Sequence, residues 1–184
     1  MVVKAGRLVL RDFREDDRPA FAAYQTDPRY ARLYGFDPGD AARADALFDR
    51  FVGWARAVPR LNWQVGIFLR DGRLCGCAGL RTDDAPAGAA ILGIELTPDD
   101  WGRHGVAVDA VSALLGFGFG TLGLRTILGR TASGNTRVER LGRWFGAAPV
   151  ASRPGPEWMA ERGWREVDWA LTRDAWAHGG HRRR

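Results

Sequence analysis

The order of elements predicted between residues 89 and 145 constrains this chain most. A strand at Ala89–Thr97 is followed by a glycine-containing turn, an apolar helix from about Arg103 to Gly120, a strand at Arg125–Thr131 and a helix at Asn135–Phe145. A helical crossover returns the second strand in the direction of the first, so at least one parallel strand pair is required. Ligand sites in such units lie beyond the carboxyl ends of the strands. The sequence therefore predicts a ligand site just after Thr97.

Antiparallel structure is predicted on either side of this segment. Strands at Trp63–Leu69 and Arg73–Arg81 flank Asp71-Gly72, a dipeptide favoured in tight hairpin turns. The other elements expected are a strand at Arg7–Phe13, a helix capped by Asp17, a helix from about Asp40 to Ala57 and a last strand at Trp164–Leu171. With no repeat or linker, we predict one α/β domain over residues 1–177 with a large mixed sheet, and a disordered basic tail at 178–184.

Composition and charge exclude several classes of protein. The 184 residues suffice for a core without disulfides or metals, so Cys75 and Cys77 are expected to be reduced, small apolar fillers. Arg182–Arg184 supply three of the five excess positive charges, which argues against nucleic-acid binding by the rest of the chain. The longest uncharged run, Ala110–Leu124, is shorter than a membrane helix requires. Because a signal-peptide pattern is also missing, we expect a cytoplasmic protein that binds no membrane.

The segment after the predicted strand carries the strongest chemical signal. Gly102 and Gly105 permit a tight turn, and the free amide hydrogens of the following helical turn can bind a phosphate group. Arg103 and His104 add further donors. Two glycines alone also occur in many strand-to-helix turns that bind no ligand, so their neighbours matter.

Taken with those neighbours, Gly102-Arg103-His104-Gly105-Val106-Ala107 resembles the pyrophosphate-binding loop (Q/R-x-x-G-x-G/A) of the GNAT superfamily of N-acyltransferases. The acid-bearing strand before it and the dipeptide Trp101-Gly102 are similar to the RimJ/RimL-like branch. The segment from Asn135 to Ala147 resembles the second CoA element of the family, and Arg7–Arg11 and Ala170–Trp176 also fit. The resemblance thus covers nearly the whole chain.

The resemblance implies a fold and an activity. The fold is a central, mostly antiparallel sheet that is splayed between two parallel strands, flanked by helices, with acyl-CoA in the opening. The activity is transfer of an acetyl group from acetyl-CoA, as co-substrate, to a primary amine by direct attack in a ternary complex, without a metal. The acceptor stays open between a protein α-amino group, a lysine and a small-molecule amine. The protein is expected to be a monomer or a homodimer.

Glu95 is the candidate general base. An ammonium group cannot attack a carbonyl, so a proton must be removed, and Glu95 is the one acid in an apolar strand. The alternative is that Glu95 forms a structural ion pair with an arginine. The main-chain amide of Leu96 or Thr97, freed where the strands part, is expected to stabilise the carbonyl oxygen. Asp99 and Asp100 are expected to be solvated or to cap the helix.

Ser133 is the candidate proton donor to the departing CoA thiolate. Relatives often use a tyrosine there, but Tyr24, Tyr30 and Tyr34 are the only tyrosines and lie far upstream. The alternative is that Ser133 only initiates a helical turn. Asn135 either binds the pantetheine arm of CoA or caps its helix.

Two groups of binding residues complete the prediction. Those expected to bind acetyl-CoA are Leu96, Thr97, Trp101, Gly102, Arg103, His104, Gly105, Val106, Ala107, Asn135 and Arg137. Those expected to bind the acceptor are Tyr30, Tyr34, Trp63 and Trp158. Two other functions stay open: a non-catalytic acyl-CoA-binding or regulatory module, and a basic protein that binds RNA or the ribosome through its arginine-rich tail.

Overall fold

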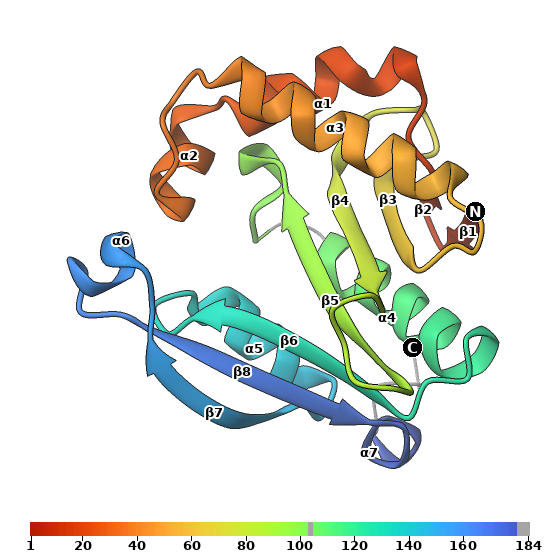
Figure 1. Ribbon diagram of the computed structural model, residues 1–184. Coiled ribbons are helices and arrows are strands. Elements are labelled where there is room, and N and C mark those ends of the chain that lie inside the picture. The colour runs from red at the N-terminus through yellow and green to blue at the C-terminus, as the bar shows by residue number, and fades with distance from the viewer. Residues whose placement is uncertain (103–104, 180–184) are drawn as a thin grey trace. The chain divides into compact units, whose positions relative to one another are not determined.

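The computed structural model describes residues 1–102 and 105–179, which form two compact units. The first unit comprises Met1–Arg81 and Ile94–Leu114, and the second comprises Thr82–Gly93 and the described residues after Leu114. Strand β5 (Ala89–Leu96) begins in the second unit and ends in the first. The described strands are hydrogen-bonded in the order β1-β2-β3-β4-β5-β6-β8-β7, which confirms the predicted large mixed sheet (Figure 1).

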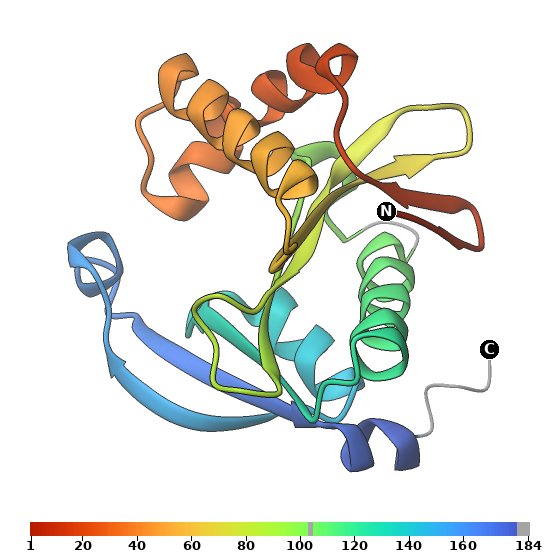
Figure 2. The same cartoon turned by 45° about the vertical axis from the view of Figure 1, so that its right-hand side comes forward.

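The first unit is antiparallel up to β4. Its strands are β1 (Val2–Ala5), β2 (Leu8–Arg11), β3 (Asn62–Leu69) and β4 (Leu74–Arg81), each paired antiparallel with the next. Its helices are α1 (Arg18–Gln25), α2 (Pro28–Tyr34), α3 (Ala41–Arg56) and α4 (Val106–Gly116), with short 3-10 turns η1 (Glu15–Asp17) and η2 (Pro98–Asp100). Helices α1 and α3 cover one face of these strands and α4 lies on the other (Figure 2).

Local chemistry explains most of these boundaries. The Asp40 carboxylate caps α3 by accepting the Arg43 N–H at 2.9 Å, and Asp71-Gly72 forms the turn between β3 and β4. The prediction that Asp17 caps α1 is wrong. The backbone of Asp17 is already helical and belongs to η1, so its carboxylate binds Arg11 at 2.7 and 2.8 Å instead.

An aromatic core lies between α1, α3 and the strands of the first unit. The Phe13 and Phe21 rings meet edge to face with their centroids 5.3 Å apart, and each also contacts Phe48 and Phe51. This core extends without a break to Tyr24, Tyr30 and Cys77. Tyr24, Tyr30 and Cys77 are therefore held within this aromatic core.

The second unit contains the parallel pair that the crossover requires. The start of β5 runs parallel to β6 (Thr126–Ala132), with Ala89 opposite Thr126 and Leu92 opposite Gly129. Strand β8 (Arg165–Thr172) is antiparallel to both β6 and β7 (Ala148–Pro154). The remaining elements are the π-helical turn η3 (Phe117–Thr121) and the helices α5 (Thr136–Trp144), α6 (Glu157–Ala160) and α7 (Arg173–His178).

Several elements lie outside the prediction. Strands β1 and β7 and helices α2, α6 and α7 were not predicted, because each is short and has a weak hydrophobic period. His178 ends α7 rather than lying in a disordered tail, whereas His181 lies outside the described residues. No helix within residues 1–102 and 105–179 is long and apolar enough to cross a bilayer.

Candidate active site

A glycine brings β4 against the end of β5. At Gly76 the backbone has φ +143°, and a Cβ there would lie 2.2 Å from the carbonyl oxygen of Glu95. Only glycine permits this approach. Next to it, the Thr97 N–H donates to the Cys75 carbonyl at 2.8 Å. The expectation of a free amide is therefore wrong for Thr97, because the strands still pair at this point; the role of Leu96 stays a prediction.

The Glu95 carboxylate accepts four hydrogen bonds from uncharged donors of the first unit. Its Oε1 accepts from the Tyr24 hydroxyl at 2.7 Å, the Gln25 Nε2 at 2.6 Å and the Cys77 thiol at 3.1 Å. Its Oε2 accepts from the Tyr30 hydroxyl. Among the described residues, none of the ion pairs involves Glu95. The alternative of a structural Glu95–arginine pair is therefore wrong for the part of the chain that the structure describes.

Helices α1 and α2 supply three of these donors. Tyr24 and Gln25 form the last turn of α1, and Tyr30 lies in α2. Helix α2 begins at Pro28, and the Asp27 carboxylate caps it by accepting the Arg29 N–H at 2.8 Å. Tyr30 was predicted to bind the acceptor, but no contact of Tyr24 or Tyr30 with Glu95 was predicted, because the two tyrosines lie 71 and 65 residues from Glu95 in the sequence. Their clustering within residues 24–34 was the available signal.

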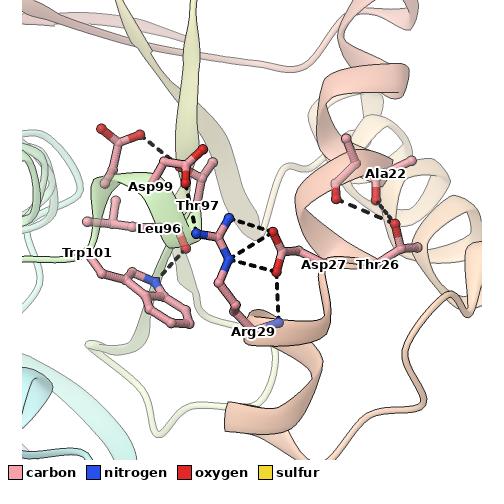
Figure 3. Close-up of polar contacts among 10 residues, drawn as sticks. Ala22, Thr26, Asp27, Arg29, Leu96, Thr97, Asp99 and Trp101 are labelled. Carbon is pink, nitrogen blue, oxygen red and sulfur yellow. Dashed lines mark hydrogen bonds and ion pairs between the residues drawn. The ribbon is translucent and has the colours of Figure 1, made fainter.

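An exposed ion-pair chain also joins α2 to the turn after β5. The Arg29 guanidinium binds Asp27 at 2.8 Å and Asp99 at 3.0 Å (Figure 3). Asp99 is solvated, as expected, with its side chain 73% exposed. Such exposed pairs contribute little stability individually, so the buried Tyr30 contact is the stronger link between α2 and β5.

Burial keeps the donors around Glu95 protonated. Burial raises the pKa of the Tyr30 hydroxyl far above its ordinary value, and the adjacent Glu95 carboxylate raises it further. Burial likewise raises the pKa of Tyr24 and of Tyr34, whose ring lies 4.7 Å from that of Tyr30 between centroids. All three tyrosines are therefore neutral hydrogen-bond donors at physiological pH.

Cys77 is more than an apolar filler. It is fully buried, as expected, but its sulfur also accepts from the Gln64 Nε2 at 3.1 Å while its thiol faces Glu95. Burial, and then the negative charge of Glu95, raise the pKa of the Cys77 thiol well above its ordinary value. Burial also raises the pKa of Cys75 to about 11. Both side chains are thus thiols rather than thiolates, and both are free of disulfides.

The turn that follows β5 is braced by a buried carboxylate. Asp100 is 3% exposed and accepts from Arg73 at 2.7 and 3.0 Å and from the Thr97 hydroxyl at 2.8 Å, so the expectation that it is solvated or caps a helix is wrong. Burial alone would raise the pKa of Asp100, but the Arg73 and Thr97 hydrogen bonds outweigh it and hold the pKa below its ordinary value. The Trp101 indole N–H donates to the Leu96 carbonyl at 2.9 Å (Figure 3).

The described parts of the loop before α4 fit a phosphate-binding role. Gly102 and Gly105 have φ of +71° and +68°, and a Cβ at either position would meet no atom within 4 Å. Within the described residues, the Asp109 N–H of α4 donates to the Gly105 carbonyl at 2.9 Å. The amides of Val106 and Ala107 lie in the first turn of α4 and have no main-chain acceptor within residues 1–102 and 105–179. The predicted ligands Arg103 and His104 lie outside the described residues.

The other predicted catalytic and CoA-binding residues belong to the second unit. The Ser133 Oγ accepts the Arg165 N–H at 3.0 Å, and the Ser133 N–H donates to the Arg165 carbonyl at 2.8 Å. The Asn135 Oδ1 accepts the Val138 N–H at 3.3 Å, so Asn135 caps α5. Arg137 is exposed in the first turn of α5. The roles of Ser133, Asn135 and Arg137 toward acetyl-CoA stay predictions.

The predicted acceptor-binding aromatics are spread over both units. Tyr30 is buried and Tyr34 is half-buried in α2, and Trp63 is half-buried in β3. Trp158 lies in α6 of the second unit, where its ring meets that of Trp164 edge to face at 6.4 Å. Of these four residues, Tyr30 donates a hydrogen bond to Glu95.

Comparison with known proteins identifies the family. The family model described as "Acetyltransferase (GNAT) domain" matches residues 7–148. The "Uncharacterized N-acetyltransferase YoaA" of Bacillus subtilis (strain 168) is 27% identical over 142 residues, which cover 76% of this chain and 78% of that protein. The GNAT-family acetyltransferase structure from Bacillus anthracis has a TM-score of 0.76 at 20% identity and covers 95% of this chain and 99% of its own.

A further similar structure is the spermidine N-acetyltransferase from Vibrio cholerae in complex with CoA and spermine. It has a TM-score of 0.74 at 13% identity and covers 94% of this chain and 99% of its own. At this identity the similarity concerns the fold alone. Because the family model spans most of the sequence, and the fold agrees with solved members, the chain belongs to the GNAT acetyltransferase family.

Proposed function

We propose that this protein is a RimJ/RimL-like N-acetyltransferase that uses acetyl-CoA and acetylates a primary amine, with Glu95 as the general base. The observation that carries the proposal is the Glu95 carboxylate itself, held by four uncharged donors at the end of β5. Among the described residues, no cation pairs with this carboxylate. The carboxylate can therefore attract an ammonium group and accept a proton from it.

The residues before α4 are assigned to acetyl-CoA. Two open glycines with positive φ, and first-turn amides of α4 that have no main-chain acceptor in the described part of the chain, suit a diphosphate because helix N-termini bind anions. When bound, acetyl-CoA supplies the acyl group as a reactive thioester. The chain itself then has two tasks in this scheme: to hold the amine close to Glu95, and to remove one of its protons.

The acceptor and the setting are narrower proposals. The solved relative that binds spermine is named for spermidine, so spermidine is a sensible test amine for this chain, beside peptides that present an α-amino group or a lysine. The two free cysteines support a reducing, cytoplasmic setting.

The test is a turnover assay with the purified full-length chain. Acetyl-CoA is mixed with spermidine, a lysine-containing peptide or a peptide with a free α-amino group, thiol release is followed and the acetylated product is identified by mass spectrometry. We expect Glu95→Gln to lower kcat about 100-fold and to leave the calorimetric Kd for acetyl-CoA unchanged. The matched control Glu139→Gln changes a partly exposed carboxylate on α5 that pairs with Arg143, and should keep wild-type turnover.

Two results would contradict the proposal. Acetyl-CoA binding without acetylation of any of these amines would favour a non-catalytic acyl-CoA-binding module. Wild-type turnover in Glu95→Gln would remove Glu95 from the reaction.

A further inference from the structure

The side-chain amide of Gln25 has a fixed orientation. Gln25 is fully buried in the last turn of α1, so both ends of its amide need partners. One end faces the Arg43 Nη1 at 3.0 Å, and the other faces the Glu95 Oε1 at 2.6 Å. A guanidinium only donates and a carboxylate only accepts, so the amide oxygen must face Arg43 and the NH₂ group must face Glu95.

Arg43 is placed to set this orientation. It extends from the first turn of α3, and its Nη2 also donates to the main-chain carbonyl of Gln25 at 2.9 Å. Its guanidinium stacks over the Phe36 ring at 4.1 Å. None of its hydrogen bonds within the described residues reaches Glu95 directly. Any effect of Arg43 on the carboxylate by hydrogen bonding therefore passes through Gln25.

The two oxygens of Glu95 are unequally occupied. Oε1 accepts from Tyr24, Gln25 and Cys77, whereas Oε2 accepts from Tyr30 alone in the part of the chain that the structure describes. Each carboxylate oxygen offers about two lone-pair sites. Oε1 is thus saturated, and Oε2 retains room for one more donor.

We propose that Gln25, oriented by Arg43, is a positioning residue for acetyl transfer. The NH₂ group of Gln25 occupies Oε1 of Glu95 and leaves Oε2 to take the proton of the acceptor amine. This inference rests on the proposed function. The N–H bond of the ammonium breaks and an O–H bond forms at Oε2. Glu95 becomes a neutral carboxylic acid and the amine becomes a neutral nucleophile, so charge and protons balance.

The positioning role predicts effects on turnover that a purely structural role would not produce. We expect Gln25→Met to lower kcat roughly 10- to 100-fold with little change in the KM for acetyl-CoA. Arg43→Met should act in the same direction, and Arg43→Lys should recover much of the lost kcat because a lysine also only donates.

The variants are combined to show the order of action, with the best acceptor among spermidine and the two peptides. If Arg43 acts through Gln25, the double variant Gln25→Met/Arg43→Met is no slower than Gln25→Met alone. If Gln25 acts through Glu95, adding Gln25→Met to Glu95→Gln changes kcat less than about twofold. Arg50→Met, on an exposed position of α3, is the matched control with wild-type kcat.

The possible failures are distinguishable. Fully additive losses in the double variants, or a wild-type kcat in Gln25→Met, overturn the positioning role while Glu95→Gln still tests the proposed function. Folding of Gln25→Met is judged by circular dichroism and acetyl-CoA binding. If this variant does not fold, the kcat of Arg43→Met is compared with that of Arg43→Lys instead. Equal kcat values for these two variants overturn the positioning role of Gln25. A wild-type chain that acetylates none of the amines overturns the proposed function and this inference with it.

Discussion

Replacing Gly76 by alanine should separate β4 from the end of β5. The added Cβ would lie 2.2 Å from the Glu95 carbonyl oxygen and 2.6 Å from the Leu96 Cα. Both are main-chain atoms, so no side-chain rotation can relieve the contact. The φ of +143° at this position is also one that L-residues rarely adopt.

The size of the effect follows from three contributions. Forcing alanine into this backbone region costs about 1–3 kcal/mol. Moving the strands apart by about 1 Å to reach van der Waals distance breaks the Thr97–Cys75 hydrogen bond of 2.8 Å, at about 1 kcal/mol. The stiffer unfolded chain offsets about 0.4–1 kcal/mol of this. We expect the free energy of unfolding to fall by about 2 kcal/mol, and kcat to fall at least tenfold because Glu95 moves.

The assay is urea unfolding followed by circular dichroism, together with hydrogen exchange at the Thr97 amide and thiol-release kinetics. The matched control is Gly53→Ala in α3, where a Cβ would meet nothing within 4 Å. That change should stabilise the protein by about 0.5–1 kcal/mol, since alanine favours a helix over glycine. If Gly76→Ala unfolds like Gly53→Ala and keeps wild-type kcat, the reasoning about close strand contact is refuted.

Two further predictions concern the turn and loop that follow β5. Gly105→Ala should weaken acetyl-CoA binding about tenfold in calorimetry, because the φ of +68° at this position costs an alanine about 1–2 kcal/mol, although the added Cβ would have open space. An unchanged Kd for acetyl-CoA would argue against this loop as the binding element. Arg73→Met leaves the buried carboxylate of Asp100 without its cation and should lower the free energy of unfolding by about 3 kcal/mol. The control is Arg70→Met: the exposed Arg70 side chain binds the Gly6 carbonyl, and its replacement should change the free energy of unfolding by less than about 0.5 kcal/mol. The pKa of Asp100 in the folded protein lies below its ordinary value of 3.8, so its contribution to the free energy of unfolding is present above about pH 4 and is lost as the pH falls through the folded pKa. Acid titrations should therefore show a smaller loss of unfolding free energy below about pH 4 in Arg73→Met than in the wild type. Equal losses would contradict the Arg73–Asp100 assignment.

Features set by neighbouring residues were predictable from the sequence. The Asp71-Gly72 hairpin, the helix predicted from about Asp40 and the strand that carries Glu95 all appear where the pattern placed them. The parallel pairing of β5 with β6 followed from the helical crossover alone. In each case the determining interaction joins residues a few positions apart, or is dictated by chain connectivity, so the order of residue types is sufficient.

The partners of Glu95 and Asp100 were decided by tertiary structure alone. Tyr24, Gln25 and Tyr30 reach Glu95 across 65 to 71 residues, and Arg73 reaches Asp100 across 27. Which of many possible donors meets a buried carboxylate depends on how α1 and α2 pack against the strands, and no local pattern encodes that geometry. The sequence thus determined which acid stands near the end of the strand, and packing determined what holds it, because a partly buried charge takes its hydrogen bonds from whichever side chains the fold brings close.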